Sequence, residues 1–175
     1  MSKRANKPTL FVSIEPAAMR IVLGADHRGY ELKNTLAAYL REHGHEVIDV
    51  GTNSDEVVDY PDLALAVGDA IQDGQADRGI LVCGSGVGAC IAANKLVGVR
   101  AAITHDVYSA HQGVEHDDMN VICLGSKIVA EDAAREIVQA FVEARFIPEE
   151  RYVRRLDKVK AMEKQGRAEH EQSPA

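Results

Sequence analysis

The segment ILVCGSGVGACIAANK, residues 80–95, decides the fold class of this chain. Its first four residues are all apolar, which is typical of a short strand buried on both faces of a parallel sheet. The glycine-rich turn GSGVG, residues 84–88, comes next, and the apolar residues after it predict a helix through Lys95. A buried strand that turns directly into a helix is the repeating unit of alternating α/β folds.

The same alternation continues on both sides of this segment. Residues 20–24, 46–50, 100–104 and 120–124 predict further strands, and helical spacing predicts helices at 30–43, 61–70, 107–114, 132–146 and 149–164. The predicted fold class is therefore α/β: a single-domain, open, five-stranded parallel sheet in a Rossmann-like three-layer sandwich, with a C-terminal helical extension. We expect a mobile extension over residues 1–18, the domain over residues 19–165 and a disordered tail over residues 166–175.

The bulk composition excludes several classes of partner. With 175 residues, 46% hydrophobic and 27% charged, the chain suits one soluble globular domain. A net charge of −7 argues against nucleic acid or an anionic membrane as a partner, and no apolar run approaches the length of a membrane span. The three cysteines, Cys83, Cys90 and Cys123, form no CxxC pair, which indicates reduced thiols in a cytoplasmic protein.

Polar side chains gather where the predicted strands end. Ligands of open parallel sheets bind beyond the carboxyl ends of the strands, so we expect these residues to converge on one edge. They are Asp26 and His27 after the first strand, Cys83 after the third, His105 and Asp106 after the fourth, and His116 and Asp117 before the fifth. Each has an ordinary interpretation as a solvated histidine, a capping aspartate or a buried thiol, and the prediction depends on their convergence.

The glycine turn predicts an anion site. Gly84, Gly86 and Gly88 let the backbone approach a ligand, and free N–H groups at the start of a helix stabilise a phosphate or an enediolate. The same helix start favours Cys83 as a thiolate, the form that acts as a base. A tight strand-to-helix turn is the plain alternative.

The sequence also bears on two other kinds of site. Residues 84–89 satisfy the dinucleotide fingerprint G-x-G-x-x-A, which leaves an oxidoreductase as an alternative. That fingerprint usually follows the first strand, and the chain has little room for a second domain. The histidines lack HxxxH, HExxH or closed-site spacing, so no metal is predicted.

Four segments together resemble a known family. GADHRGYELK (residues 24–33), DYPD (59–62), residues 80–95 and the stretch from His116 to Val121 resemble the type B ribose-5-phosphate isomerases, which belong with the galactose-6-phosphate isomerase subunits. The likeness covers residues 19–160. It implies a Rossmann-like homodimer or homotetramer, with active sites shared across the subunit interface. It also implies aldose–ketose isomerisation of a phosphorylated sugar without a metal or nucleotide cofactor.

The resemblance also implies a role for each matching residue. Cys83 matches the base that moves a proton between C1 and C2, Ser85 the adjacent hydroxyl that assists, and His116 the ring-opening histidine, expected to reach in from the other subunit. The anion hole over the enediolate is matched by Gly84, Gly86, Val87 and Gly88. The residues that match sugar and phosphate contacts are Asp26, His27, Tyr60, Asp117, Lys127, Arg151 and Arg155.

Three departures from the family's common residues leave the identity of the sugar open. Asp117 replaces a common asparagine, Lys127 an arginine and Tyr152 a histidine, all at substrate-contacting positions. A carboxylate cannot donate to sugar hydroxyls, and lysine lacks the bidentate fork of arginine. Ribose 5-phosphate with ribulose 5-phosphate is expected, while erythrose, erythrulose, allose or galactose phosphates are alternatives. A non-catalytic subunit of a heteromeric isomerase is a further alternative, against which the presence of both Cys83 and His116 argues.

Overall fold

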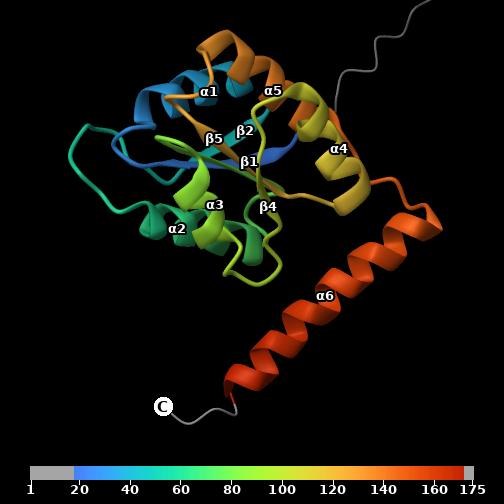
Figure 1. Ribbon diagram of the computed structural model, residues 1–175. Coiled ribbons are helices and arrows are strands. Elements are labelled where there is room, and N and C mark those ends of the chain that lie inside the picture. Colours follow the sequence, from blue (N-terminus) through green and yellow to red (C-terminus); the bar gives the residue numbers. More distant parts are fainter. Residues whose placement is uncertain (1–17, 172–175) are drawn as a thin grey trace, which may run out of the picture.

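The computed structural model describes the backbone of residues 18–171 and the side chains of residues 18–165. A five-stranded sheet forms the middle of three layers (Figure 1). Its strands are β1 (Arg20–Ala25), β2 (Glu46–Asp49), β3 (Arg78–Cys83), β4 (Ala101–Ile103) and β5 (Val121–Gly125). They lie in the order β2-β1-β3-β5-β4, and every neighbouring pair is parallel. The predicted fold class is confirmed.

Six helices complete the described part of the chain. They are α1 (Tyr30–Glu42), α2 (Tyr60–Gln72), α3 (Val87–Ala93), α4 (Val107–Asp117), α5 (Glu131–Glu143) and α6 (Glu150–Glu171). The first, fourth and fifth helices cover one face of the sheet, and α2 and α3 cover the other, while α6 projects from the body (Figure 1).

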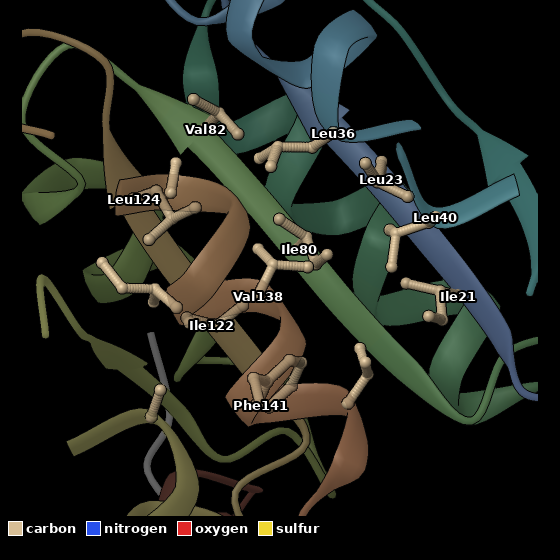
Figure 2. Packing of buried hydrophobic residues seen from close by; sticks show 14 of the residues in the cluster. Ile21, Leu23, Leu36, Leu40, Ile80, Val82, Ile122, Leu124, Val138 and Phe141 are labelled. Carbon is tan, nitrogen blue, oxygen red and sulfur yellow. The ribbon is translucent and has the colours of Figure 1, made fainter. Parts of the chain in front are cut away.

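The alternation of side chains along β3 divides the core between the two faces. Ile80 and Val82 point to the face covered by α1 and α5, where they pack with the residues seen in Figure 2: Ile21, Leu23, Leu36, Leu40, Ile122, Leu124, Val138 and Phe141. Leu81 and Cys83 point to the opposite face, toward α2 and α3. Because successive strand residues face opposite ways, a continuous apolar run is required to bury both faces.

Arg78, the first residue of β3, ties the sheet to the end of α5. Its buried guanidinium donates to the carbonyl of Phe141 and, at 2.6 Å, to that of Ala144. It also lies 5.0 Å from the centre of the Phe141 ring. The last carbonyls of a helix have no partner within it, so the guanidinium satisfies them. Burial lowers the pKa of Arg78 to about 10.

Two predicted boundaries differ in ways that matter. Helix α4 continues to Asp117, where the spacing of apolar residues predicted an end at 114. Helix α6 continues to Glu171, so residues 166–171, which were predicted to be disordered, are helical. The predictions for residues 1–17 and 172–175 lie outside the described residues.

Candidate active site

The carboxyl edge of the sheet carries Cys83. This residue ends β3, lies beside Gly125 of β5, and is 5% exposed. The backbone N–H of Gly86 donates to its sulfur, with 3.1 Å between nitrogen and Sγ. Gly86 adopts a φ of 83°, and a Cβ there would lie 3.3 Å from the backbone carbon of Leu124. Glycine at 86 is therefore required for the turn that aims the N–H back at the sulfur.

The rest of the glycine turn packs against the loop that follows β5. The hydroxyl of Ser85 is exposed and accepts the N–H of Val87 at 3.3 Å. The N–H groups of Ser126 and Lys127 donate to the carbonyls of Cys83 (2.8 Å) and Gly84 (3.1 Å). These bonds bring Lys127, whose side chain is exposed, to the same edge as Cys83.

Asp26 shapes the turn between β1 and α1. Its buried carboxylate accepts the N–H groups of Arg28 and Gly29 at 2.9 and 3.1 Å. The turn also packs directly on the end of β3, since a Cβ on Gly29 would lie 2.4 Å from the carbonyl oxygen of Val82. Asp26 thus has a structural function at the edge where a substrate contact was predicted.

His27 and Tyr60 complete this cluster. The Nδ1 of His27 accepts the N–H of Val58 at 3.5 Å, which ties the turn to the loop before α2. The ring of Tyr60, 41% exposed, covers the glycine turn, because a Cβ on Gly88 would lie 2.7 Å from its Cζ atom. The carboxyl edge therefore gathers the predicted residues Asp26, His27, Tyr60, Cys83, Ser85, Lys127 and the glycine turn.

The ordinary interpretation holds for the two polar residues after β4. His105 accepts the N–H of Gly125 through Nε2 at 3.1 Å. Asp106 caps α4 by accepting the N–H of Ser109 at 2.7 Å, and this backbone bond lowers the pKa of Asp106. Both side chains serve the local structure.

The prediction that all these residues converge on one edge is wrong for His116 and Asp117. Both residues occupy the last turn of α4. The backbone carbonyl of the next residue, Asp118, accepts a hydrogen bond of 2.6 Å from the Nε of Arg100, which directly precedes β4. Residues that precede a parallel strand lie at its amino end. The length of β5 separates that edge from Cys83 by roughly 13 Å, at about 3.3 Å per residue.

A second cluster of predicted residues lies at this amino edge. The ring of His116 stacks on that of Tyr152, with centroids 4.0 Å apart and 15° between planes. The guanidinium of Arg151 lies 4.5 Å from the centre of the Tyr152 ring and donates to the Tyr152 hydroxyl at 2.7 Å. Arg155, also exposed, follows one turn later on α6. Gln112, which no sequence pattern indicated, lies one turn before His116, and its Nε2 is 2.6 Å from the His116 Nδ1.

A cavity of about 850 Å³ lies beside this cluster, between α6 and the body. The apolar side chains of Leu96, Val99 and Met119 line it from the body, and Val159 and Met162 line it from α6. Asp117 also lines it.

Cys90 and Cys123 pack in the core between the sheet and α3, as predicted. Cys123 is buried and Cys90 is half-buried. A hydrogen bond with the Cys123 thiol is the main cause that lowers the pKa of Cys90 to about 7, while the pKa of Cys123 is raised well above its ordinary value. The sequence pattern did not indicate this thiol pair.

Known proteins resemble this chain over most of its length. The sequence profile of the Ribose/Galactose Isomerase family matches residues 21–159. The chain belongs to this family. Within it, ribose-5-phosphate isomerase B of Escherichia coli is 43% identical over 144 residues, covering 82% of this chain and 96% of that protein. D-erythrulose-4-phosphate isomerase of Pectobacterium atrosepticum is 42% identical over 129 residues, covering 73% and 85%.

A solved structure of the same family has the same fold. Ribose-5-phosphate isomerase B of Clostridium thermocellum superposes with a TM-score of 0.82 at 44% identity, covering 84% of this chain and 99% of that one. The family resemblance inferred from the four sequence segments is therefore confirmed.

Within residues 18–165, no group of three or more His, Cys, Asp or Glu side chains is arranged to hold a metal ion. Among the described helices, none combines the length and the apolar character that a membrane span requires.

Proposed function

We propose that the protein is an aldose–ketose isomerase of sugar phosphates, with ribose 5-phosphate and ribulose 5-phosphate as the leading substrate pair. The observation that carries the proposal is the Cys83 sulfur, which lies at the end of β3 and accepts the N–H of Gly86 from the glycine turn. A thiolate beside backbone N–H groups joins a base to donors for a developing oxyanion.

The proposed reaction moves one proton between two carbons. The Cys83 thiolate takes the proton from C2 of the open-chain aldose, a C1–C2 double bond forms, and the carbonyl electron pair moves onto O1. N–H groups of residues 84–88 stabilise this enediolate. The Ser85 hydroxyl passes a proton from O2 to O1, and the proton on sulfur returns to C1. A ketone remains at C2 and the thiolate is regenerated, without any external oxidant or reductant.

We infer that each active site is shared between two copies of the chain. Cys83 lies at the carboxyl ends of the strands and His116 lies at their amino ends, so these two side chains of one chain do not contact the same small sugar phosphate. In the proposed homodimer, the partner contributes His116 to open the sugar ring and Asp117 to bind a hydroxyl, while its Arg151 and Arg155 hold the phosphate. Asp26, His27, Tyr60 and Lys127 contact the sugar from the Cys83 side.

Exposed apolar side chains support an interface at the β4 edge of the sheet. Ile91 of α3 is 59% exposed and Tyr108 at the start of α4 is 67% exposed. Ile103, the last residue of edge strand β4, and Val107 lie between them in the chain and are also exposed. A group of exposed apolar side chains of this kind is typical of a subunit interface. A homotetramer built from such dimers is the alternative assembly.

A four-carbon sugar phosphate is the second candidate substrate. The D-erythrulose-4-phosphate isomerase of Pectobacterium atrosepticum is as similar to this chain as the ribose-5-phosphate isomerase B of Escherichia coli, at 42% against 43% identity. Asp117, Lys127 and Tyr152 depart from the common pattern at the positions proposed to contact the substrate or its phosphate. We expect these three residues to determine which sugar is preferred.

The test is a parallel isomerisation assay with EDTA present, on aldose phosphates of four, five and six carbons. We expect turnover by the unaltered protein and a loss of about 10²- to 10⁴-fold for Cys83→Ala. Cys90→Ala, which removes a thiol outside the proposed site, is the matched control and should keep the activity of the unaltered protein. Full activity of Cys83→Ala would refute the assignment of the base. Absence of turnover by the unaltered protein, with NAD binding in a titration, would favour the oxidoreductase.

A further inference from the structure

Gln112 and His116 form a pair on α4 that no part of the proposed mechanism explains. The residues are one helical turn apart, and the Nε2 of Gln112 lies 2.6 Å from the Nδ1 of His116. An amide nitrogen only donates, so the Nδ1 of His116 is the acceptor. In the neutral ring the proton is then on Nε2, the nitrogen on the far side from Gln112.

Tyr152 constrains the same ring from its face. Its side chain is 4% exposed and stacks on His116 with 15° between the planes. Arg151 holds the Tyr152 hydroxyl at 2.7 Å. The lone pair of a ring nitrogen lies in the plane of the imidazole, so a hydrogen bond to Nδ1 restrains rotation of the ring, whereas stacking acts perpendicular to the plane. Together they fix both the rotation and the tilt of His116.

We propose that Gln112 is a positioning residue that holds His116 as the Nε2–H tautomer, with Tyr152 as the platform for its ring, so that His116 donates a hydrogen bond to the ring oxygen of a cyclic sugar phosphate. This inference rests on the proposed function and adds the residue that prepares His116 for ring opening. It also states which nitrogen carries the proton.

The proton balance of ring opening shows why the tautomer matters. In a ribofuranose 5-phosphate the C1–O4 bond breaks, O4 gains a proton and the anomeric hydroxyl loses one. Nε2 supplies the proton to O4, solvent takes the proton from the anomeric hydroxyl, and solvent restores the proton on Nε2. An imidazole with its proton on Nδ1 presents a lone pair to O4 and cannot donate. Erythrose 4-phosphate forms no such ring, because its O4 carries the phosphate.

The tautomer is measured directly by ¹⁵N NMR of histidine-labelled protein, at a pH well above the ordinary histidine pKa of about 6.5. The His116 signals are those missing in His116→Asn. We expect Nε2–H in the unaltered protein and Nδ1–H in Gln112→Glu, because a carboxylate of the same shape accepts where the amide donates. Gln112→Leu should show a mixture. Nδ1–H in the unaltered protein would overturn the proposal.

Kinetics separate positioning from a structural effect. We expect Gln112→Glu to lower kcat/KM for ribose 5-phosphate by about 10²-fold and to leave that for erythrose 4-phosphate unchanged. Glu115→Gln breaks the neighbouring His111–Glu115 pair on the same helix and should alter neither value. Equal losses on both substrates, or no loss on either, would overturn the proposal. If the unaltered protein turns over no sugar phosphate, the proposed function fails, while the NMR result still decides the tautomer.

Discussion

Replacing Lys33 by methionine tests how the loop beside the candidate site is held. The Lys33 side chain is fully buried, and its ammonium lies 2.5 and 2.6 Å from the two carboxylate oxygens of Asp49 and 2.9 Å from the Oδ1 of Asn53. Three acceptors thus serve its three donors. Asp49 also accepts the N–H of Gly51 at 2.9 Å. The ion pair therefore connects α1 to the loop that leads to Tyr60.

The expected cost follows from what Lys33→Met leaves behind. Methionine keeps the apolar stem and removes the charge, so Asp49 loses its counter-ion. Breaking a buried ion pair from one side costs about 3–5 kcal/mol. The Asp49 side chain is 23% exposed and can still be hydrated. The expected loss therefore lies near the lower end of this range, at about 3 kcal/mol. That is a large share of a typical unfolding free energy of about 5–15 kcal/mol.

Urea unfolding measures this loss. With a slope of about 2 kcal/mol per molar urea, the midpoint should fall by about 1.5 M with an unchanged slope. Lys33→Met with Asp49→Asn should recover most of the loss, because no unpaired charge remains. Asp77→Asn, which breaks the exposed Arg20–Asp77 pair, should barely move the midpoint. A loss below about 1 kcal/mol for Lys33→Met, or a double variant no more stable than the single one, would refute the reasoning.

Three further predictions concern the turn, the thiol pair and the helix cap. Gly86→Ala should lower kcat far more than the melting temperature, since its φ of 83° costs alanine about 1–2 kcal/mol while the N–H moves off Cys83; an unchanged kcat would contradict this. Peptide-resolved alkylation by iodoacetamide should modify Cys90 at a rate that rises with pH and has its midpoint near 7, because only the thiolate reacts; a midpoint near 8.5, the ordinary thiol value, would refute the lowered pKa. Arg78→Leu should destabilise the protein by about 2–3 kcal/mol and speed amide exchange in the last turn of α5, because the Phe141 carbonyl loses the guanidinium and the Ala144 carbonyl keeps only the bond from Arg145; unchanged exchange there would argue against the cap.

The sequence by itself determined the fold class and one half of the candidate site. An apolar run with alternating faces indicates a buried strand, and a glycine turn followed by helical spacing indicates the next helix, because both patterns are local. The carboxyl ends of parallel strands share one edge in any such fold. Cys83, Asp26 and His27 were therefore expected at the same edge, and the structure brings them together; Tyr60, which the family resemblance implied, lies there too.

The tertiary structure alone decided the strand order and which side chains meet in the second half of the candidate site. His116 was expected at the carboxyl ends of the strands, but a residue that precedes a parallel strand lies at its amino end, and His116 precedes β5. The pairing of His116 with Tyr152, and of Cys90 with Cys123, joins elements far apart in the chain. Arg78 begins a strand in the sequence but caps a helix in space. Periodicity specifies which face a residue takes, whereas the partner it meets there depends on how whole elements pack, and that information is not local.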